Sequence, residues 1–287
     1  MSSELHRLVA EELAQPVDPR VAAMAAAVAA RHGTASRAVL FYGSCLRERQ
    51  LDGLMLDFYL IVSDYRAAYD KPWLARANAL IPPNVFPFQH DGLAAKYAVL
   101  SEADFHRLNG PETRNVSVWA RFAQPSRLVW ASDDAARAAA IAAVARAAPT
   151  LLVAAGRVAG ESALDWWRRA FSLTYSAELR AERKGRSGSV VDADAHRYAQ
   201  FSAPAAAAIE AGAASGGWGR RRIEGKLLSV ARLAKASATY AGGADYIVWK
   251  INRHAGTDFA LTPWQRRHPL LAAISLLPRL LRSGAIR

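Results

Sequence analysis

The stretch "VLFYGSCLRERQLDGLMLDFYLIVSDY", residues 39–65, decides the fold. An apolar run rich in β-forming residues ends in Gly43-Ser44, a polar connection follows, and Asp57 stands near the head of a second apolar run. Runs of this length and composition predict two buried strands, residues 37–43 and 56–62. The connection is long enough for a turn or short helix that returns the chain to a neighbouring strand.

A Gly-Ser turn beside a carboxylate suits the binding of a triphosphate. Gly43 lets the backbone pass close to phosphate groups, and its amide and the Ser44 hydroxyl can donate hydrogen bonds to phosphate oxygens. A carboxylate on the next strand, Asp57, can hold Mg²⁺ against the same phosphates. Polymerase-β-type nucleotidyltransferases share this arrangement. The alternative is an ordinary turn followed by an aspartate that opens a strand.

Asp57 has no second carboxylate on its own strand face. Nucleotidyltransferase sites usually carry two acids two residues apart, so that both point to one face; Met55 and Tyr59 occupy those positions here. Asp52 in the connection, Glu178 far along the chain, or a substrate phosphate can complete a metal site. An unpaired charge beside an apolar strand is costly, which favours metal binding by Asp57 over a capping role.

The remaining sequence predicts an α/β half followed by a mainly helical half, a fold class of α/β + α. We expect a nucleotidyltransferase domain over residues 1–148, a helical domain over 149–265 and a basic amphipathic segment over 266–287. The predicted further elements are a strand at 94–101 and helices that follow Asp18, follow Ser101, run to about Pro149, follow Ser162 and cover 220–240.

Composition places the chain among globular proteins, with 52% hydrophobic and 22% charged residues in a total of 287. Its one cysteine, Cys45, excludes a disulfide framework and a cysteine-based zinc site. We see no signal peptide at the start. Of the net charge of +12, residues 220–287 carry +10. This asymmetry indicates a polyanionic partner, either nucleic acid, an anionic membrane surface or phosphorylated substrates, unless it is a solvated basic face.

Four motifs in chain order resemble the mitochondrial-type phosphatidate cytidylyltransferases (the translocator assembly and maintenance proteins), a family that also has bacterial members. The motifs are "FYGSCL", "MLDFYLIVSD", "NVFPFQHDGLAAKYAVLSEADF" and "LTYSAELRAE". The resemblance runs from about residue 39 to 182 and more faintly to Gly242. It implies a polymerase-β-like nucleotidyltransferase domain, a smaller helical, winged-helix-like domain, Mg²⁺ as cofactor, and CTP and phosphatidic acid as substrates.

The same resemblance implies roles for individual residues. Gly43 and Ser44 match the triphosphate turn, Asp57 matches the metal-binding acid, and Lys96 matches the lysine of the third strand. The further matches lie in the helical half, and we expect them to serve nucleotide binding (Tyr175, Lys235) and catalysis (Glu178, Arg180). The chain departs from the family pattern at Cys45, at Ala98 and at Ala177-Glu178, where Gly-Asp is usual.

The residues themselves leave two readings for Glu178. Trp167, Phe171 and Tyr175 step by four residues along one helical face, and Glu178 continues that stripe. An acid on an apolar face requires a metal or an arginine partner, so Glu178 either supplies the missing carboxylate or forms a structural salt bridge. Lys96 has two readings as well: within a central strand its ammonium must meet an anion such as a phosphate, and on an edge strand it is solvated.

Cations with helical spacing are candidates for phosphate binding. Arg232 and Lys235 share a helix face, as do Lys250 and Arg253. We expect Arg232, Lys250 and Arg253 to contact a lipid phosphate, with a solvated helix face as the alternative. The leucine-rich segment 266–287 carries cations at both ends and suits a helix in the interface of an anionic membrane, or a helix packed on the protein.

These features together predict a peripheral-membrane phosphatidate cytidylyltransferase. We expect it in the cytoplasm, on the inner face of the cell membrane. One alternative is a nucleotidyltransferase that acts on a soluble acceptor or RNA; nucleic acid is not expected, because the sequence has no aromatic-interleaved RNA-binding motif. The other alternative is a non-catalytic membrane-associated protein on a degenerate nucleotidyltransferase fold.

Overall fold

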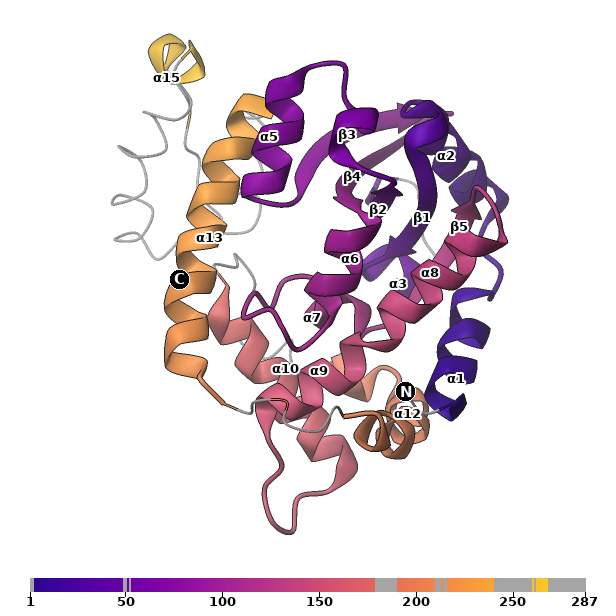
Figure 1. Cartoon of the computed structure of the whole chain (residues 1–287), viewed down its shortest axis with the longest axis vertical. Coiled ribbons are helices and arrows are strands. Elements are labelled where there is room, and N and C mark those ends of the chain that lie inside the picture. Colours follow the sequence, from indigo (N-terminus) through magenta and orange to yellow (C-terminus); the bar gives the residue numbers. More distant parts are fainter. Residues whose placement is uncertain are drawn as a thin grey trace.

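A mixed five-stranded sheet lies at the centre of the protein, with the strand order β3-β4-β2-β1-β5 (Figure 1). The computed structural model describes residues 3–48, 51, 53–178, 190–209, 213, 216–239, 260 and 262–267. The strands are β1 (Ser36–Tyr42), β2 (Met55–Val62), β3 (Asn84–His90), β4 (Leu93–Ser101) and β5 (Ser126–Ala131). The structure therefore confirms a mixed α/β fold with its sheet in the N-terminal half.

Helices surround the sheet and make up the regular structure described after β5. Before β5 they are α1 (Ser3–Leu13), α2 (Pro19–Ala30), α3 (Ser44–Glu48), α4 (Tyr65–Ala68), α5 (Pro72–Leu80), α6 (Glu102–Asn109) and α7 (Trp119–Phe122). After β5 they are α8 (Asp134–Ala145), α9 (Ala147–Ala155), α10 (Ala163–Ala177), α12 (Ala195–Ala207), α13 (Trp218–Thr239) and α15 (Pro263–Arg267).

The three predicted strands are confirmed, and their pairing aligns three polar side chains. β1 and β2 pair antiparallel, with α3 in the connection, and β2 pairs with β4 in parallel. The register places Tyr42 opposite Asp57 and Asp57 opposite Lys96. Partners across neighbouring strands point to the same face of a sheet, so these three side chains form one row.

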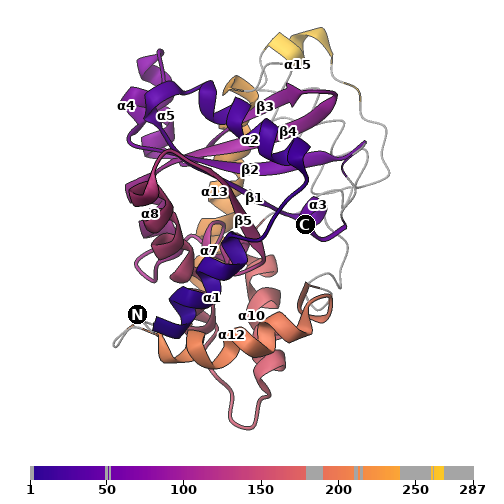
Figure 2. The ribbon, with the colours of Figure 1, turned by 90° about the vertical axis from the view of Figure 1, so that its right-hand side faces the viewer.

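Each face of the sheet has its own hydrophobic cluster. Leu40 and Tyr59 belong to a cluster that continues into α1, α6, α8, α9, α10 and α12. Val39 and Phe58, one residue away on each strand, belong to a cluster on the opposite face that includes α2. Figure 2 shows α2 on one side of the sheet and α1, α10 and α12 on the other. This alternation follows from the two-residue period of a strand.

The predicted helix starts are confirmed by their capping hydrogen bonds. Asp18 accepts from the Arg20 amide at the start of α2, and Ser101 and Ser162 accept from the third residue of α6 and α10. The helix expected to end near Pro149 ends earlier, at Ala145, and α9 runs through Pro149. Proline is tolerated in the first turn of a helix, because the amide that it lacks would have no partner inside the helix.

Several elements escaped the sequence prediction, and polar contacts attach some of them to the rest. α1 is joined to α12 by a buried ion pair between Glu12 and Arg197. Arg197 also donates to the Ala123 carbonyl at 3.0 Å and lies 4.3 Å from the centre of the Phe201 ring. The pair therefore fixes the N-terminal helix against the C-terminal half.

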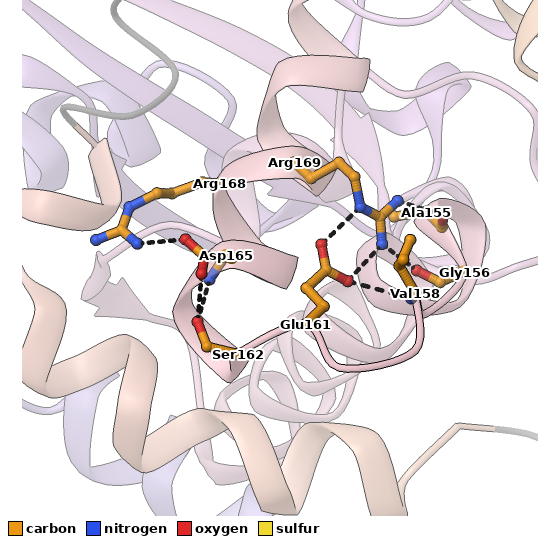
Figure 3. A network of polar contacts seen from close by, with 8 residues as sticks. All are labelled: Ala155, Gly156, Val158, Glu161, Ser162, Asp165, Arg168 and Arg169. Atoms are coloured by element: carbon orange, nitrogen blue, oxygen red, sulfur yellow. Dashed lines mark hydrogen bonds and ion pairs between the residues drawn. The ribbon is translucent and has the colours of Figure 1, made fainter.

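Arg169 organises the turn between α9 and α10 (Figure 3). Its guanidinium donates to the carbonyl of Ala155 at 2.8 Å and to that of Gly156 at 2.6 Å. Carbonyls at the end of a helix have no partners inside the helix. Glu161 binds the same guanidinium at 2.7 and 2.8 Å. This network closes the end of α9 and sets the direction of α10.

The two predicted domains share one hydrophobic cluster, which extends from Leu5 to Ala205, and the boundary near residue 148 stays a prediction. Among the described residues, Asp134–Ala155 is the segment that is long and apolar enough to cross a membrane. However, 67% of its most apolar window is buried inside the protein. That burial is consistent with a soluble or peripheral protein. Nearly all of the segment 266–287 lies outside the described residues.

α13 is held by a close contact at a glycine. Figure 1 shows it as a long helix along one side of the molecule, and it contacts both α10 and β3. At Gly225 the helix approaches α10 so closely that a Cβ atom would lie 2.2 Å from the Ala177 carbonyl oxygen. No side chain fits at this distance, so the contact requires glycine.

Gly225→Ala should therefore push α13 away from α10 and destabilise the protein by about 1–3 kcal/mol, the usual cost of overpacking. Gly219→Ala is the matched control, because a Cβ at Gly219 meets nothing within 4 Å on the same helix. It should leave stability unchanged or raise it by up to about 1 kcal/mol. Urea unfolding of both variants measures the difference. Equal stability of the two variants would show that the contact at Gly225 does not require glycine.

Candidate functional site

The row of Tyr42, Asp57 and Lys96 forms the centre of the candidate site. Asp57 Oδ1 lies 2.9 Å from Lys96 Nζ, and the two side chains are 21% and 27% exposed. β4 lies between β3 and β2, so Lys96 is not on an edge strand and that reading of the sequence is wrong. Among the described residues, Asp57 is an anion that Lys96 meets.

The Gly43 turn covers the Asp57 carboxylate. Gly43 has a φ of +98°, a backbone conformation that glycine adopts without strain. A Cβ atom at this position would lie 3.0 Å from Asp57 Oδ2. Ser44 follows as the first residue of α3. The structure thus brings Gly43, Asp57 and Lys96 together, with Ser44 next along the chain, and their roles stay predictions.

Glu178 meets an arginine that the sequence reasoning missed. α10 ends at Ala177, and at Glu178 the backbone is extended. Only 8% of the Glu178 side chain is exposed, and its Oε1 lies 3.9 Å from Arg121 Nη1. Trp167 and Phe171, earlier on the predicted stripe, are fully buried. The arginine partner is therefore present, and metal binding by Glu178 stays a prediction.

Arg121 comes from the short helix α7 and faces the row on the sheet. Its guanidinium donates to the Ser117 carbonyl, and the side chain as a whole is 31% exposed. Burial alone would lower the pKa of Arg121, but neighbouring acidic and phenolic groups raise it above its ordinary value. These groups are Tyr59, Glu178, Tyr42 and Asp57. Arg121 is therefore the cation that lies near both carboxylates, Asp57 and Glu178.

Tyr42 remains a neutral phenol in this setting. Burial raises its pKa well above the ordinary value, and the charge of Asp57 adds to that effect. The positive charge of Arg121 acts in the opposite direction and is the weaker influence. Tyr42 thus lies near both Asp57 and Arg121 and adds no charge of its own.

α13 brings two further predicted residues to the edge of the site. Arg232 Nε donates to the Pro82 carbonyl at 2.9 Å, and its Nη1 donates to Ser117 Oγ at 2.8 Å. Lys235 donates to the carbonyls of Ile81 and Pro83, which precede β3. Burial, together with the charge of Arg232, lowers the pKa of Lys235 to about 7.

The remaining predicted residues are Tyr175 and four that the structure does not describe. Tyr175 is half-buried on α10 and packs against the cluster that contains Leu40. Four predicted residues lie outside the described residues: Asp52, Arg180, Lys250 and Arg253.

The described residues supply a candidate carboxylate ligand for Mg²⁺, that of Asp57. They contain no group of three or more His, Cys, Asp or Glu side chains that could hold a metal. Asp57 Oδ1 is buried, however, and accepts no hydrogen bond of normal geometry, although Lys96 is close. Mg²⁺ commonly binds through one or two carboxylates together with phosphate oxygens and water. Asp57 fits that mode, with phosphate oxygens as the other ligands.

No model of a known protein family matches this chain, and no curated protein matches it. The resemblance to phosphatidate cytidylyltransferases therefore rests on the quoted motifs.

The pKa of Lys235 yields a test of its burial. Because this pKa is about 7 in the folded protein and 10.5 ordinarily, the unfolded chain binds more protons between these values. Burial of the charged lysine costs most below pH 7, and the cost falls as the pH rises toward 10.5. The unfolding free energy of the wild type should therefore rise relative to that of Lys235→Met between pH 6.5 and 9.

Urea unfolding at several pH values measures this difference. Lys226→Met is the control for the loss of a lysine from the same helix, because Lys226 is exposed. A Lys235→Met difference that does not change with pH would show that Lys235 is not held in a desolvated site.

Proposed function

We propose that the protein is a Mg²⁺-dependent nucleotidyltransferase of the phosphatidate cytidylyltransferase type, which converts CTP and phosphatidic acid to CDP-diacylglycerol and pyrophosphate. The observation that carries the proposal is that the Asp57 carboxylate lies beneath the Gly43 turn, with Lys96 Nζ 2.9 Å from Asp57 Oδ1. A polymerase-β-like fold for the sheet domain and a winged-helix-like character for the helical part belong to the same proposal.

The reaction joins two phosphate groups. A phosphate oxygen of the lipid attacks the α-phosphorus of CTP, the bond from this phosphorus to the oxygen that bridges to the β-phosphorus breaks, and pyrophosphate leaves with that bonding electron pair. The attacking oxygen is already an anion, so the protein needs no strong base. Alignment of the two phosphates and neutralisation of their charge then supply most of the rate.

The residues of the Gly43 turn would hold the nucleotide. The Gly43 amide and the Ser44 hydroxyl would donate hydrogen bonds to the triphosphate, which the absence of a side chain at Gly43 allows to approach. Asp57 would hold Mg²⁺ together with phosphate oxygens, and the bound ion would neutralise phosphate charge. Lys96 would hold the Asp57 carboxylate in place and offset charge on the nucleotide.

The basic C-terminal half supports an anionic lipid as the acceptor. Residues 220–287 carry most of the net charge, and within them Arg232 and Lys235 lie beside the site. Lys250, Arg253 and the segment 266–287 would add contacts to an anionic membrane. The protein would then act as a cytoplasmic, peripheral enzyme on the inner face of the cell membrane.

Replacement of Asp57 tests the proposal. Asp57→Asn keeps the shape of the side chain but removes the charge that would bind Mg²⁺, so Mg²⁺-dependent transfer from labelled CTP to phosphatidic acid should fall by about a thousandfold or more. Asp134→Asn, on the exposed first turn of α8, should retain the activity of the wild type. Thermal unfolding of both variants checks that they are folded.

The outcome in the wild type decides between the candidate functions. Label from CTP in the lipid fraction supports the proposal, and label in a soluble acceptor or RNA would replace the lipid as acceptor. Absence of transfer and of CTP binding, with or without Mg²⁺, would contradict enzymatic activity of this type.

A further inference from the structure

Two arginines from different parts of the chain meet at Ser117. Arg121 in α7 donates to the Ser117 carbonyl, and Arg232 in α13 donates to the Ser117 hydroxyl at 2.8 Å. Ser117 itself is almost fully buried, so both guanidiniums are fixed to the interior of the protein. Each arginine also lies close enough to Glu178 for the charge of this carboxylate to act on it.

Among the described residues, the carboxylate of Glu178 acts on both guanidiniums. Its contact with Arg121 is long, at 3.9 Å. Among the described residues, Arg232 donates hydrogen bonds only to neutral oxygens, and its buried Nη2 has no hydrogen-bond partner. Burial lowers the pKa of Arg232; Tyr59 and Glu178 act in the opposite direction, and the neighbouring charge of Arg121 adds to the lowering. Like charges held together in a partly buried site are costly unless an anion joins them.

We propose that Arg121 and Arg232, joined through Ser117, form a phosphate-binding subsite in which the carboxylate of Glu178 competes with the phosphate. Guanidinium groups match phosphate oxygens with paired hydrogen bonds, and the Arg121 side chain is partly exposed, at 31%. The influence of Asp57 on Arg121 places the subsite beside the centre of the candidate site. A phosphate bound here would lie next to a nucleotide held by the Gly43 turn.

The chemistry of the ligand is that of a phosphate group with free oxygens. In the proposed reaction, on which this identification rests, such a group occurs both in the acceptor, a phosphomonoester, and in the nucleotide. Kinetics distinguish these sources. If the acceptor phosphate binds here, Arg121→Gln should raise the KM for the acceptor about tenfold or more and change the KM for CTP much less. The reverse pattern would assign the subsite to the nucleotide.

Titration calorimetry with inorganic phosphate tests the subsite without any reaction. Arg121→Gln should weaken phosphate binding about tenfold or more, because it removes a charged donor. Glu178→Gln should instead tighten binding several-fold, because it removes the competing carboxylate. Arg137→Gln, on the exposed face of α8, is the control and should bind phosphate as the wild type does. Thermal unfolding confirms that each variant is folded.

The opposite signs of the two changes separate this role from a structural one. If Arg121 and Glu178 form only a structural pair, both substitutions would destabilise the protein and neither would alter phosphate affinity, and that result would overturn the subsite. Glu178→Gln retains this test even if Arg121→Gln does not fold. Phosphate binding with the expected pattern, in a protein that does not transfer label from CTP, would retain the subsite and reject the proposed function.

Discussion

Asp57 and Lys96 stand opposite each other on the parallel strands β2 and β4, and their side chains meet at 2.9 Å. This contact depends on register, because a shift of one residue would turn Asp57 into the hydrophobic cluster on the other face. The neighbours of Asp57 on β2 fix that register, because Phe58 packs into the cluster on one face and Tyr59 into the cluster on the other. The packing of the sheet therefore determines where the polar row can lie.

Helices complete the site that the sheet begins. Arg121, Glu178 and Arg232 come from α7, from the end of α10 and from α13, and they gather beside the row on the sheet. Their positions depend on helix packing, including the Gly225 contact with α10. The candidate site, which has Asp57 and Lys96 on the sheet, thus draws three further charges from α7, α13 and the end of α10, and two of them are positive.

The sequence was most informative where a local pattern has one physical meaning. Alternation and β-forming residues predict β1, β2 and β4, and capping residues predict the starts of α2, α6 and α10, because these signals depend on neighbours in the chain. β3 was missed because Pro87 interrupts it, and proline is accepted there since β3 is an edge strand. The pairing of Asp57 with Lys96 could not be predicted without the strand order. Arg121 lies in a helix of four residues with no periodicity, so its place beside Glu178 follows from tertiary packing alone.

The central claim is that Asp57, beneath the Gly43 turn, is where a nucleotide and a divalent cation meet. A crystal structure with a non-hydrolysable CTP analogue and Mn²⁺ in place of Mg²⁺ tests it most directly, because the anomalous signal of Mn²⁺ locates the ion independently of the atomic coordinates. The account predicts a Mn²⁺ peak at the Asp57 carboxylate, shared with phosphate oxygens of an analogue that lies against Gly43 and Ser44. An ion or a triphosphate bound elsewhere, with Asp57 still paired only to Lys96, would contradict it.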